Sequence, residues 1–244
     1  MKQNTKASTE NTKRQARAIR ILNATTELVL RWGYDKTTID DIAKHAGVGK
    51  GTIYLHWKTR EALFETLLLH EMIAVIEALL QHLQKKPEHI LLHHVMRSLF
   101  QLTEQRPLTK ALFTDDRELL GELVRPGTTN TAMRTRRLLM ARDYLEVLRK
   151  YEFIRNDMSL DAQLYALNAT VSGFFLTDPS LTAEEQLSNI DRAEILAQTV
   201  RNAFEPETLP SSMHLEEVAP QVLHIFAQLH RAFQQSMQEE LGYM

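Results

Sequence analysis

The sequence predicts an all-α protein, built as a small N-terminal helical unit joined to a larger helical body. Apolar residues recur three and four positions apart, as at Leu91, Val95, Leu99 and Leu102, a spacing that places them on one face of a helix. Strand-like alternation is hard to find, and the seven prolines and eight glycines stand between long helical patterns. With 244 residues, 43% of them hydrophobic, the chain is long enough to bury a sizeable core.

The absence of cysteine excludes a disulfide framework and thiolate metal or redox chemistry, and it suits a reducing compartment. No apolar run approaches the roughly 18 residues needed to cross a bilayer. Residues 1–12 are polar and basic, and no apolar stretch of a signal peptide follows them. We therefore expect a cytoplasmic protein that is neither secreted nor bound to a membrane.

Charge is distributed unevenly along the chain, although the net charge is only −2. Residues 1–60 contain twelve Lys or Arg and five Asp or Glu, a balance of +7, which leaves −9 on the remaining 184 residues. This asymmetry predicts a basic N-terminal unit that can meet phosphate groups and an acidic body that does not. Charges sorted by chance over a helix-rich surface are the simpler alternative.

A helix-turn-helix is predicted between Thr38 and Lys58. Thr38 and Asp41 form a capping box that begins a short helix, and Gly47 stands where a left-handed residue would end it. A second helix is expected from Lys50 to about Trp57. Its Ile53 and Trp57, four residues apart, would face the core. Two short helices joined by a tight glycine-containing turn, the second with donors on its outer face, are typical of a DNA-binding motif.

Seven short motifs stand in a fixed order between about residues 15 and 65: ILNA at 21–24, GY at 33–34, TTIDDIA at 37–43, AGV at 46–48, KGTIY at 50–54, HWK at 56–58 and REAL at 60–63. In this order the segment closely resembles the N-terminal domain of TetR-family repressors. The resemblance implies a three-helix helix-turn-helix DNA-binding domain joined to a larger helical ligand-binding and dimerisation domain. One departure is Gly49, where the family often has a serine that caps the second helix.

Seven residues are expected to contact double-stranded operator DNA: Thr38, Lys50, Gly51, Thr52, Tyr54, His56 and Lys58. Gly51 would let the helix backbone approach the duplex, and Lys50 and Thr52 would reach base edges or a phosphate. The family resemblance makes Tyr54 and His56 phosphate-positioning groups. The alternatives are a helix flaw at Gly51, a solvated pair at Lys50 and Thr52, and a packed Tyr54.

Thr38 can cap its helix and also donate to a phosphate, and Lys58 can reach the same strand. A basic arm and first helix would flank this surface with Lys13, Arg14, Arg17 and Arg20. The expected core of the unit consists of Trp32, Ile39, Ile42, Val48, Ile53 and Trp57.

Four segments are expected: a flexible basic leader at 1–12, the DNA-binding domain at 13–59, the ligand-binding and dimerisation domain at 60–208, and an additional C-terminal helix at 209–244. Helices in the body are predicted near 60–85, 88–105, 108–123, 128–151, 159–177 and 183–204. A last one runs from about 214 or 220 to 240, with Pro220 able to open it. Its seam of Val222, Phe226, Leu229 and Phe233 favours one partner helix, so we expect it to pack on the dimer bundle or cross to the other subunit.

Two body helices predict a homodimer. Residues 160–176 are apolar nearly all round, with a small-residue stripe of Ala162, Ala166, Ala169 and Gly173. The next helix carries Leu187, Ile190, Ala193, Ala197, Val200 and Phe204 along one side. By resemblance these helices form a four-helix bundle with their mates, whereas an ordinary intramolecular core is the alternative.

The family resemblance also places a small-molecule effector pocket among the first body helices. Its candidate lining is His94, Arg97, Phe100, Met133, Arg137, Met140, Tyr165, Asn168 and Thr170, although each of these can equally be a satisfied core or surface group. The chemistry of the effector stays open, from a fatty acyl chain to a polyaromatic drug.

No catalytic, cofactor or metal site is predicted. His89 and His93 are four residues apart, but no further ligand joins them at suitable spacing. His70-Glu71 lacks the second histidine of a zinc peptidase, because Ala74 stands in its place. We expect a dimeric, sequence-specific repressor that an effector releases from an inverted-repeat operator. The alternatives are a helical adaptor that binds nucleic acid or acidic lipid through charge alone and, more remotely, a small-molecule enzyme.

Overall fold

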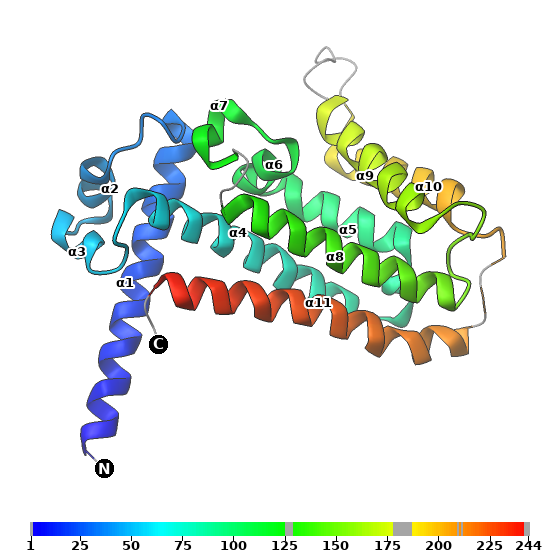
Figure 1. Ribbon diagram of the computed structural model, residues 1–244, viewed down its shortest axis with the longest axis horizontal. Helices are drawn as coiled ribbons and strands as arrows, with labels where there is room; N and C mark the ends of the chain where they lie inside the picture. The colour runs from blue at the N-terminus through cyan, green and yellow to red at the C-terminus, as the bar shows by residue number, and fades with distance from the viewer. Residues whose placement is uncertain (1, 125–128, 178–186, 209, 211, 242–244) are drawn as a thin grey trace.

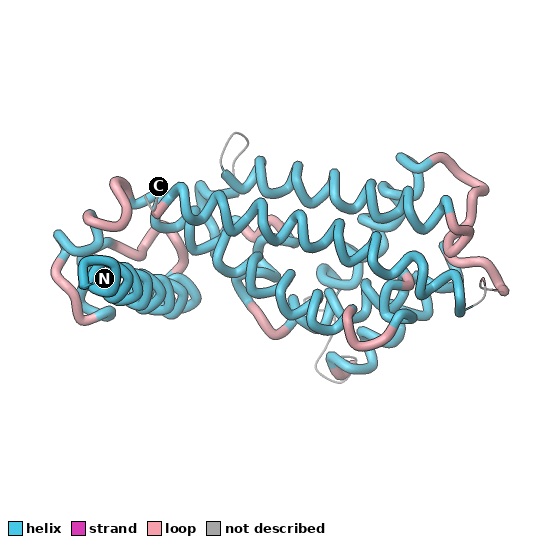
Figure 2. Tube along the Cα trace, turned by 90° about the horizontal axis from the view of Figure 1, so that it is seen from below, coloured by secondary structure: helices cyan, strands magenta, loops and turns pink. Residues whose placement is uncertain are grey.

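The computed structural model describes residues 2–124, 129–177, 187–208, 210 and 212–241, and these residues form helices and no strand (Figures 1 and 2). The predicted all-α class is therefore confirmed. Three helices form an N-terminal unit at one end of the molecule, and the remaining helices form an elongated body (Figure 1). Figure 2 shows α1 end-on, so this helix crosses the long axis of the body.

The N-terminal unit consists of α1 (Lys2–Trp32), α2 (Ile39–Ala46) and α3 (Lys50–Tyr54). Because α1 begins at Lys2, the expected leader at 1–12 forms the first turns of a helix from residue 2 onward. The physical reason is that neither glycine nor proline occurs before Gly33 to end it. Trp32 was expected in the core, yet it lies 40% exposed at the end of α1. Val48 is only half-buried against the core.

The predicted capping box is present at the start of α2. The Thr38 hydroxyl accepts the Asp41 amide hydrogen at 3.2 Å, and the Asp41 carboxylate accepts that of Thr38 at 3.3 Å. Gly47 ends the helix with φ 64°, the left-handed conformation that glycine adopts without strain. The second helix is shorter than predicted and ends at Tyr54. Trp57 nevertheless packs in the core, where its Nε1 donates to the Thr66 hydroxyl at 2.9 Å.

The body begins with α4 (Arg60–Leu83), followed by the 3₁₀ turn η1 (Pro87–Ile90) and α5 (Leu92–Glu104). The helix predicted at 108–123 is broken into α6 (Pro107–Thr114), α7 (Arg117–Leu120) and η2 (Gly121–Val124). The break has a local cause, because Asp115 adopts φ 51° and Asp116 caps α7 by accepting the Leu119 amide hydrogen at 3.0 Å.

Four longer helices complete the body: α8 (Thr129–Lys150), α9 (Leu160–Thr177), α10 (Asn189–Phe204) and α11 (Ser212–Glu240). Residues 128 and 183–186, expected in two of these helices, lie outside the described residues. Pro220 lies inside α11 rather than at its start.

The predicted apolar stripes of α9 and α10 are only partly buried within the chain. Four residues of the α10 stripe are buried within the chain, where α10 packs against α5: Ala193, Ala197, Val200 and Phe204. For them the intramolecular alternative is correct. Leu187 and Ile190 are instead 51% and 68% exposed. In α9 only Gln163, Leu167 and Phe175 are buried, and the other residues of this apolar helix are half-buried or exposed.

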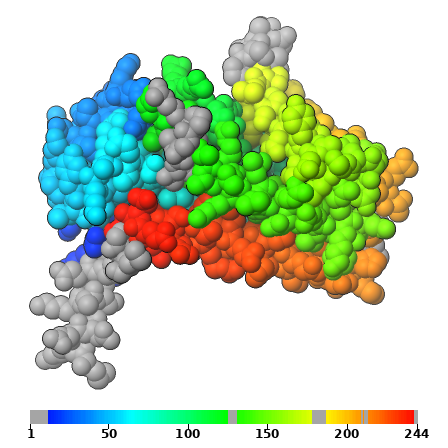
Figure 3. Space-filling model, viewed as in Figure 1, coloured from blue at the N-terminus to red at the C-terminus, as the bar shows by residue number. Residues whose placement is uncertain are grey.

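Helix α11 packs along α4 and α8 of its own chain, which corrects the expectation that it lies on the α9 and α10 bundle or leaves for another subunit. Its predicted seam is buried, but against these helices and against the N-terminal unit. At its end the Leu241 carbonyl accepts a hydrogen bond from Arg14 of α1 at 3.2 Å. Figure 3 shows this end of α11, in red, against the N-terminal unit in blue and cyan.

The joint between the N-terminal unit and the body is built on Arg60, the first residue of α4. Its guanidinium carbon lies 3.9 Å from the ring centroid of Tyr34 and 4.8 Å from that of Phe64. The same guanidinium donates to the Tyr34 and Thr37 carbonyls. The loop after α1 also contacts α7, since the Tyr34 amide donates to the Leu119 carbonyl at 2.9 Å.

We predict that Phe233→Ala lowers the free energy of unfolding by about 3–5 kcal/mol, because a fully buried phenyl ring between α11 and the rest of the core is removed. Urea denaturation followed by circular dichroism, at one fixed protein concentration, measures the change. The matched control is Gln234→Ala at an exposed neighbouring position. A loss below about 1 kcal/mol for Phe233→Ala would show that α11 is attached only loosely.

Candidate nucleic-acid interface and internal cavity

The α2–α3 motif brings six of the seven predicted DNA-contacting residues to the surface. Thr52 is half-buried. The other five are exposed: Thr38, Lys50, Gly51, Tyr54 and Lys58. Lys50 Nζ lies 3.0 Å from the Asp40 carboxylate, so the N-terminus of α3 lies beside the first turn of α2. The hydrogen bond to Asp40, aided by its charge, raises the pKa of Lys50. The amine is therefore cationic and held next to the start of both helices.

His56 does not join this surface. Its side chain is buried beside the Trp57 ring, and its Nδ1 has no hydrogen-bond partner among the described residues. Burial lowers the pKa of His56, and the charges of Arg14 and Arg17 lower it further. The expectation that His56 positions a phosphate is therefore wrong. Because α3 ends at Tyr54, the chain turns before His56 and takes its ring into the core.

Gly51 is exposed on α3, and a β-carbon placed on it would meet no atom of the protein within 4 Å. The packing of this chain therefore does not require glycine here, and its φ is not in the left-handed region. Glycine in a helix costs about 1 kcal/mol relative to alanine, so the position carries a stability cost without an internal benefit. A close approach by something outside the chain is the remaining physical reason for it.

The basic residues of α1 fall into two groups. Lys13, Arg17 and Arg20 are exposed. Arg14 is half-buried and donates to the carbonyls of Leu55, at 3.5 Å, and Leu241, at 3.2 Å. Arg14 thus connects α1 with the end of α3 and the end of α11, which the sequence did not indicate.

The body encloses a cavity of about 400 Å³. It is lined from α4, α5, α6, α8, α9 and α11, mostly by aliphatic, methionine and phenylalanine side chains, and its volume lies within the range of small-molecule sites. Of the nine predicted lining residues, Arg137, Met140 and Asn168 are in the wall. Sequence reasoning missed most of the others, among them Met72, Ile76, Leu112, Phe113 and Leu229. Their apolar spacing on helices does not distinguish a cavity wall from a filled core.

The other six predicted lining residues lie elsewhere. Phe100 and Met133 are buried in the core, and Tyr165 is 79% exposed on the outer side of α9. Arg97 pairs with Glu194 at 3.1 Å, and the Thr170 hydroxyl donates to the Ala166 carbonyl. The ring of His94 lies against that of His93, with centroids 4.1 Å apart. Helical periodicity could not separate these positions, because it does not say which face of α8 or α9 turns inward.

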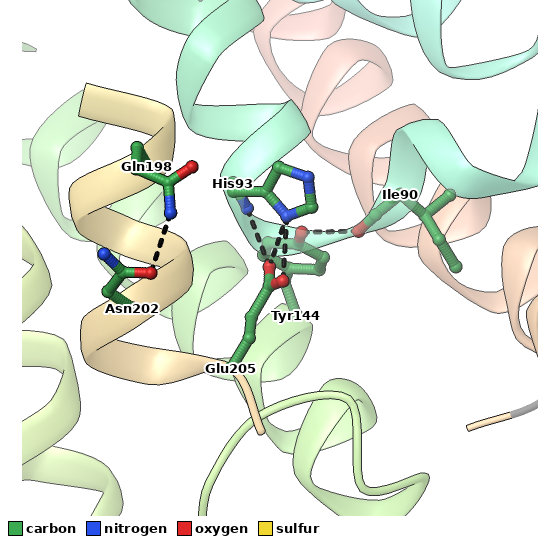
Figure 4. A network of polar contacts seen from close by, with 6 residues as sticks. All are labelled: Ile90, His93, Tyr144, Gln198, Asn202 and Glu205. Carbon is green, nitrogen blue, oxygen red and sulfur yellow. Dashed lines mark hydrogen bonds and ion pairs between the residues drawn. The ribbon is translucent and has the colours of Figure 1, made fainter. Parts of the chain in front are cut away.

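A buried polar network joins α5 to the end of α10 (Figure 4). Glu205 accepts from the His93 backbone amide at 3.0 Å and lies 2.8 Å from its Nδ1 through each carboxylate oxygen. Nearby, the Tyr144 hydroxyl donates to the Ile90 carbonyl at 2.6 Å. Within the part of the chain that the structure describes, no three His, Asp or Glu side chains are placed to hold a metal ion. The contacts of Glu205 with His93 tie the end of α10 to the start of α5.

Comparison with known proteins begins with the DNA-binding unit. Residues 21–67 match the model of a family described as bacterial regulatory proteins, tetR family. The uncharacterised HTH-type transcriptional regulator YhgD of Bacillus subtilis is 34% identical over 102 residues, 41% of this chain and 52% of that protein. The HTH-type transcriptional repressor BepR of Brucella suis is 25% identical over 159 residues, 63% of this chain and 76% of that protein. The chain thus spans about half the length of the first relative.

Among solved structures, FadR of Bacillus subtilis in complex with stearoyl-CoA has a similar fold, with a TM-score of 0.60 and 18% identity over 75% of this chain and 96% of that chain. Residues 21–67 of this chain thus match the DNA-binding domain of the tetR family, and the relatives that the chain resembles are described as transcriptional regulators. Members of this family are regulators and not enzymes. The family match ends at residue 67, so the cavity and α11 lie beyond the matched residues. Among the helices described, none is long and apolar enough to cross a membrane.

The partly buried position of His94 predicts that the stability of the folded protein depends on pH. Burial, followed by the charges of His93 and His89, lowers the pKa of His94 to about 4; Arg97 lowers it further, and Glu205 opposes the shift. As the pH falls below about 6.5, His94 becomes protonated in the unfolded chain, whereas in the folded chain it stays neutral until about pH 4. The folded state therefore loses stability between pH 6.5 and 4.

We predict that His94→Gln removes this part of the acid destabilisation, on the order of 1–2 kcal/mol after allowance for the partial exposure of the ring. Urea denaturation at a series of pH values from 7.5 to 4 measures it. His224→Gln, at an exposed position of α11, is the control and should leave the pH profile unchanged. Identical profiles for the parent and His94→Gln would contradict the assignment.

Proposed function

We propose that the protein binds double-stranded operator DNA as a homodimer, recognises an inverted repeat and represses transcription until a small-molecule effector releases it. The observation that carries the proposal is the capped α2–α3 frame with Gly51 exposed beside the donors of Lys50 and Thr52. Binding through charge alone needs basic residues, but it does not need a capped two-helix frame with a glycine at the contact surface.

Roles within this surface follow from position and chemistry. Lys50 and Thr52 lie in the first turn of α3, the end of a recognition helix that enters the major groove, where their donors can reach base edges. Thr38, Tyr54 and Lys58 are exposed donors around it and are assigned to phosphates, which position the protein without reading sequence. With Gly49 in place of a serine, the cap of α3 has no side-chain hydrogen bond.

We predict that selection from random DNA at near-physiological salt recovers an inverted repeat with the parent protein. Gly51→Glu should bind that sequence about 100-fold more weakly or worse, because its carboxylate meets the duplex where the backbone must approach. Its helicity and sedimentation should be unchanged, since a side chain at Gly51 has free space within the protein.

The control is Lys85→Glu, because Lys85 is an exposed residue of the body and this substitution also makes the protein more negative. This variant should bind normally. Recovery of no common sequence by the parent protein would favour charge-driven binding without sequence preference. Full binding by Gly51→Glu would contradict the placement of α3 in the groove.

The homodimer is supported by the outer face of α9 and α10. Helices α9 and α10 lie side by side (Figure 1). These two helices and the approach to α10 carry exposed apolar side chains, namely Tyr165, Leu176, Leu187, Ile190 and Ile195. A face of this kind is typical of a surface that a partner covers. A two-fold dimer places two recognition helices on one side of the DNA, which is the reason for expecting an inverted repeat.

We predict that Ile190→Asp converts the dimer to a monomer at micromolar concentration, because a carboxylate replaces an apolar side chain that is 68% exposed on the proposed interface. Sedimentation velocity measures the change. Leu139→Asp, at a 56% exposed position of α8 away from this face, serves as the control and should stay dimeric. A monomeric parent protein, or an unaltered Ile190→Asp dimer, would refute the interface.

Effector control is supported by the path of α4. This helix begins at Arg60 in the joint with the DNA-binding unit and supplies Met72, Val75, Ile76 and Leu79 to the cavity wall. A ligand that shifts α4 would therefore also move the N-terminal unit that is attached to the start of this helix. Release requires the effector to favour the released conformation by the coupling free energy, typically 1–3 kcal/mol. The similarly folded FadR was crystallised with stearoyl-CoA, which agrees with a ligand site in such a body.

A further inference from the structure

The cavity in the body has one charged side chain whose hydrogen-bonding capacity is not used. Most of its wall is apolar, with Met72, Ile76, Leu79 and Phe175 among the contributing residues. Arg137 of α8 is part of the same wall, and its Nη1 is buried without a hydrogen-bond partner among the residues that the structure describes. A buried charged donor without an acceptor is costly, so such groups are rare unless something else satisfies them.

The surroundings of Arg137 hold it as a cation. Its guanidinium carbon lies 4.6 Å from the ring centroid of Phe113, another wall residue. Burial lowers the pKa of Arg137 to about 10, with a smaller lowering from Arg134 and an opposing effect of Asp115. Since this value is still well above neutral pH, the side chain carries its charge in the cavity.

Asp115, the acidic side chain whose charge acts on Arg137, is already engaged. Both carboxylate oxygens of Asp115 accept from the Arg134 guanidinium, and both residues belong to the cavity wall. This pair leaves Arg137 as the wall cation whose donor has no acceptor among the described residues. A ligand cation would meet the charge of Arg137 at short range, and a neutral ligand would leave Nη1 unsatisfied.

We propose that the cavity binds an amphiphile with one carboxylate head and an aliphatic body, the carboxylate on Arg137 and the body along α4 and α9. This inference rests on the proposed function, because it names the class of effector for the same cavity. A carboxylate fits better than a phosphate ester, which carries more charge and usually engages several cations, whereas here one guanidinium nitrogen has no partner among the described residues. The aliphatic body suits a wall of flexible methionine, leucine and isoleucine side chains.

The test is a calorimetric titration of the full-length protein, without DNA, with three twelve-carbon probes below their micelle concentrations: dodecanoate, dodecanol and dodecyltrimethylammonium. We expect dodecanoate to bind most tightly and the quaternary ammonium most weakly. Arg137→Gln should weaken dodecanoate binding about 10- to 100-fold while leaving dodecanol binding nearly unchanged, because only the carboxylate uses the guanidinium.

Arg136→Gln is the matched control, since this neighbouring arginine is exposed, lies outside the cavity wall and donates instead to the Ala232 carbonyl and the Ser236 hydroxyl of α11. It should bind dodecanoate like the parent protein. Thermal melting of both variants confirms that they are folded. Absence of dodecanoate binding, equal binding of the three probes, or an Arg137→Gln variant with unchanged dodecanoate affinity would overturn the proposal.

Binding to the selected operator, measured separately with and without saturating dodecanoate, distinguishes this inference from the proposed function. Operator binding by a protein that does not take up dodecanoate refutes the ligand class and leaves DNA recognition intact. Arg137-dependent dodecanoate binding with no effect on operator affinity supports the ligand class and refutes the effector switch. If both hold, reciprocity requires operator DNA to lower dodecanoate affinity by the same factor.

Discussion

Arg60 is the contact on which the orientation of the DNA-binding unit depends. Its guanidinium lies against the rings of Tyr34 and Phe64, which contact each other edge to face, and it donates to the carbonyls of Tyr34 and Thr37. One planar cation thereby fixes the loop between α1 and α2 to the first turn of α4, using stacking and charge-assisted hydrogen bonds together. Because Thr38 follows this loop, the start of α2 is placed relative to α4, and α3 is placed through its contact with α2.

Two further contacts make the joint more than a single hinge. Leu119 of α7 accepts the Tyr34 amide hydrogen, and Leu241 after α11 accepts from Arg14 of α1. The cavity is lined partly by α4 and by Leu229 of α11, so two helices that reach the N-terminal unit also form part of the cavity wall. A ligand that moves one of them must move the other or break their common packing. Such coupling favours two discrete arrangements over gradual bending.

Two charged groups of the body, Glu205 and Arg137, differ in how their hydrogen-bonding groups are satisfied. Glu205 is fully engaged by the backbone and ring of His93, and it ties α10 to α5. Arg137 lies in the cavity wall against the ring of Phe113, and its buried Nη1 has no hydrogen-bond partner among the described residues. The sequence marked both Arg137 and Arg97 as candidate lining residues in the same way. Only the fold shows that Arg97 pairs with Glu194, whereas Arg137 lies in the wall.

The sequence by itself determined the all-α class and the α2–α3 motif, because caps, helix-ending glycines and three-to-four spacing act over a few residues. Local signals also placed Lys50, Gly51 and Thr52 on the outer side of α3. Tertiary packing decided what these signals cannot reach: His56 is buried because α3 ends early, and α11 lies on α4 and α8. It also decided which apolar positions surround a void rather than fill a core, since both are apolar faces of helices and only the positions of the neighbouring helices distinguish them.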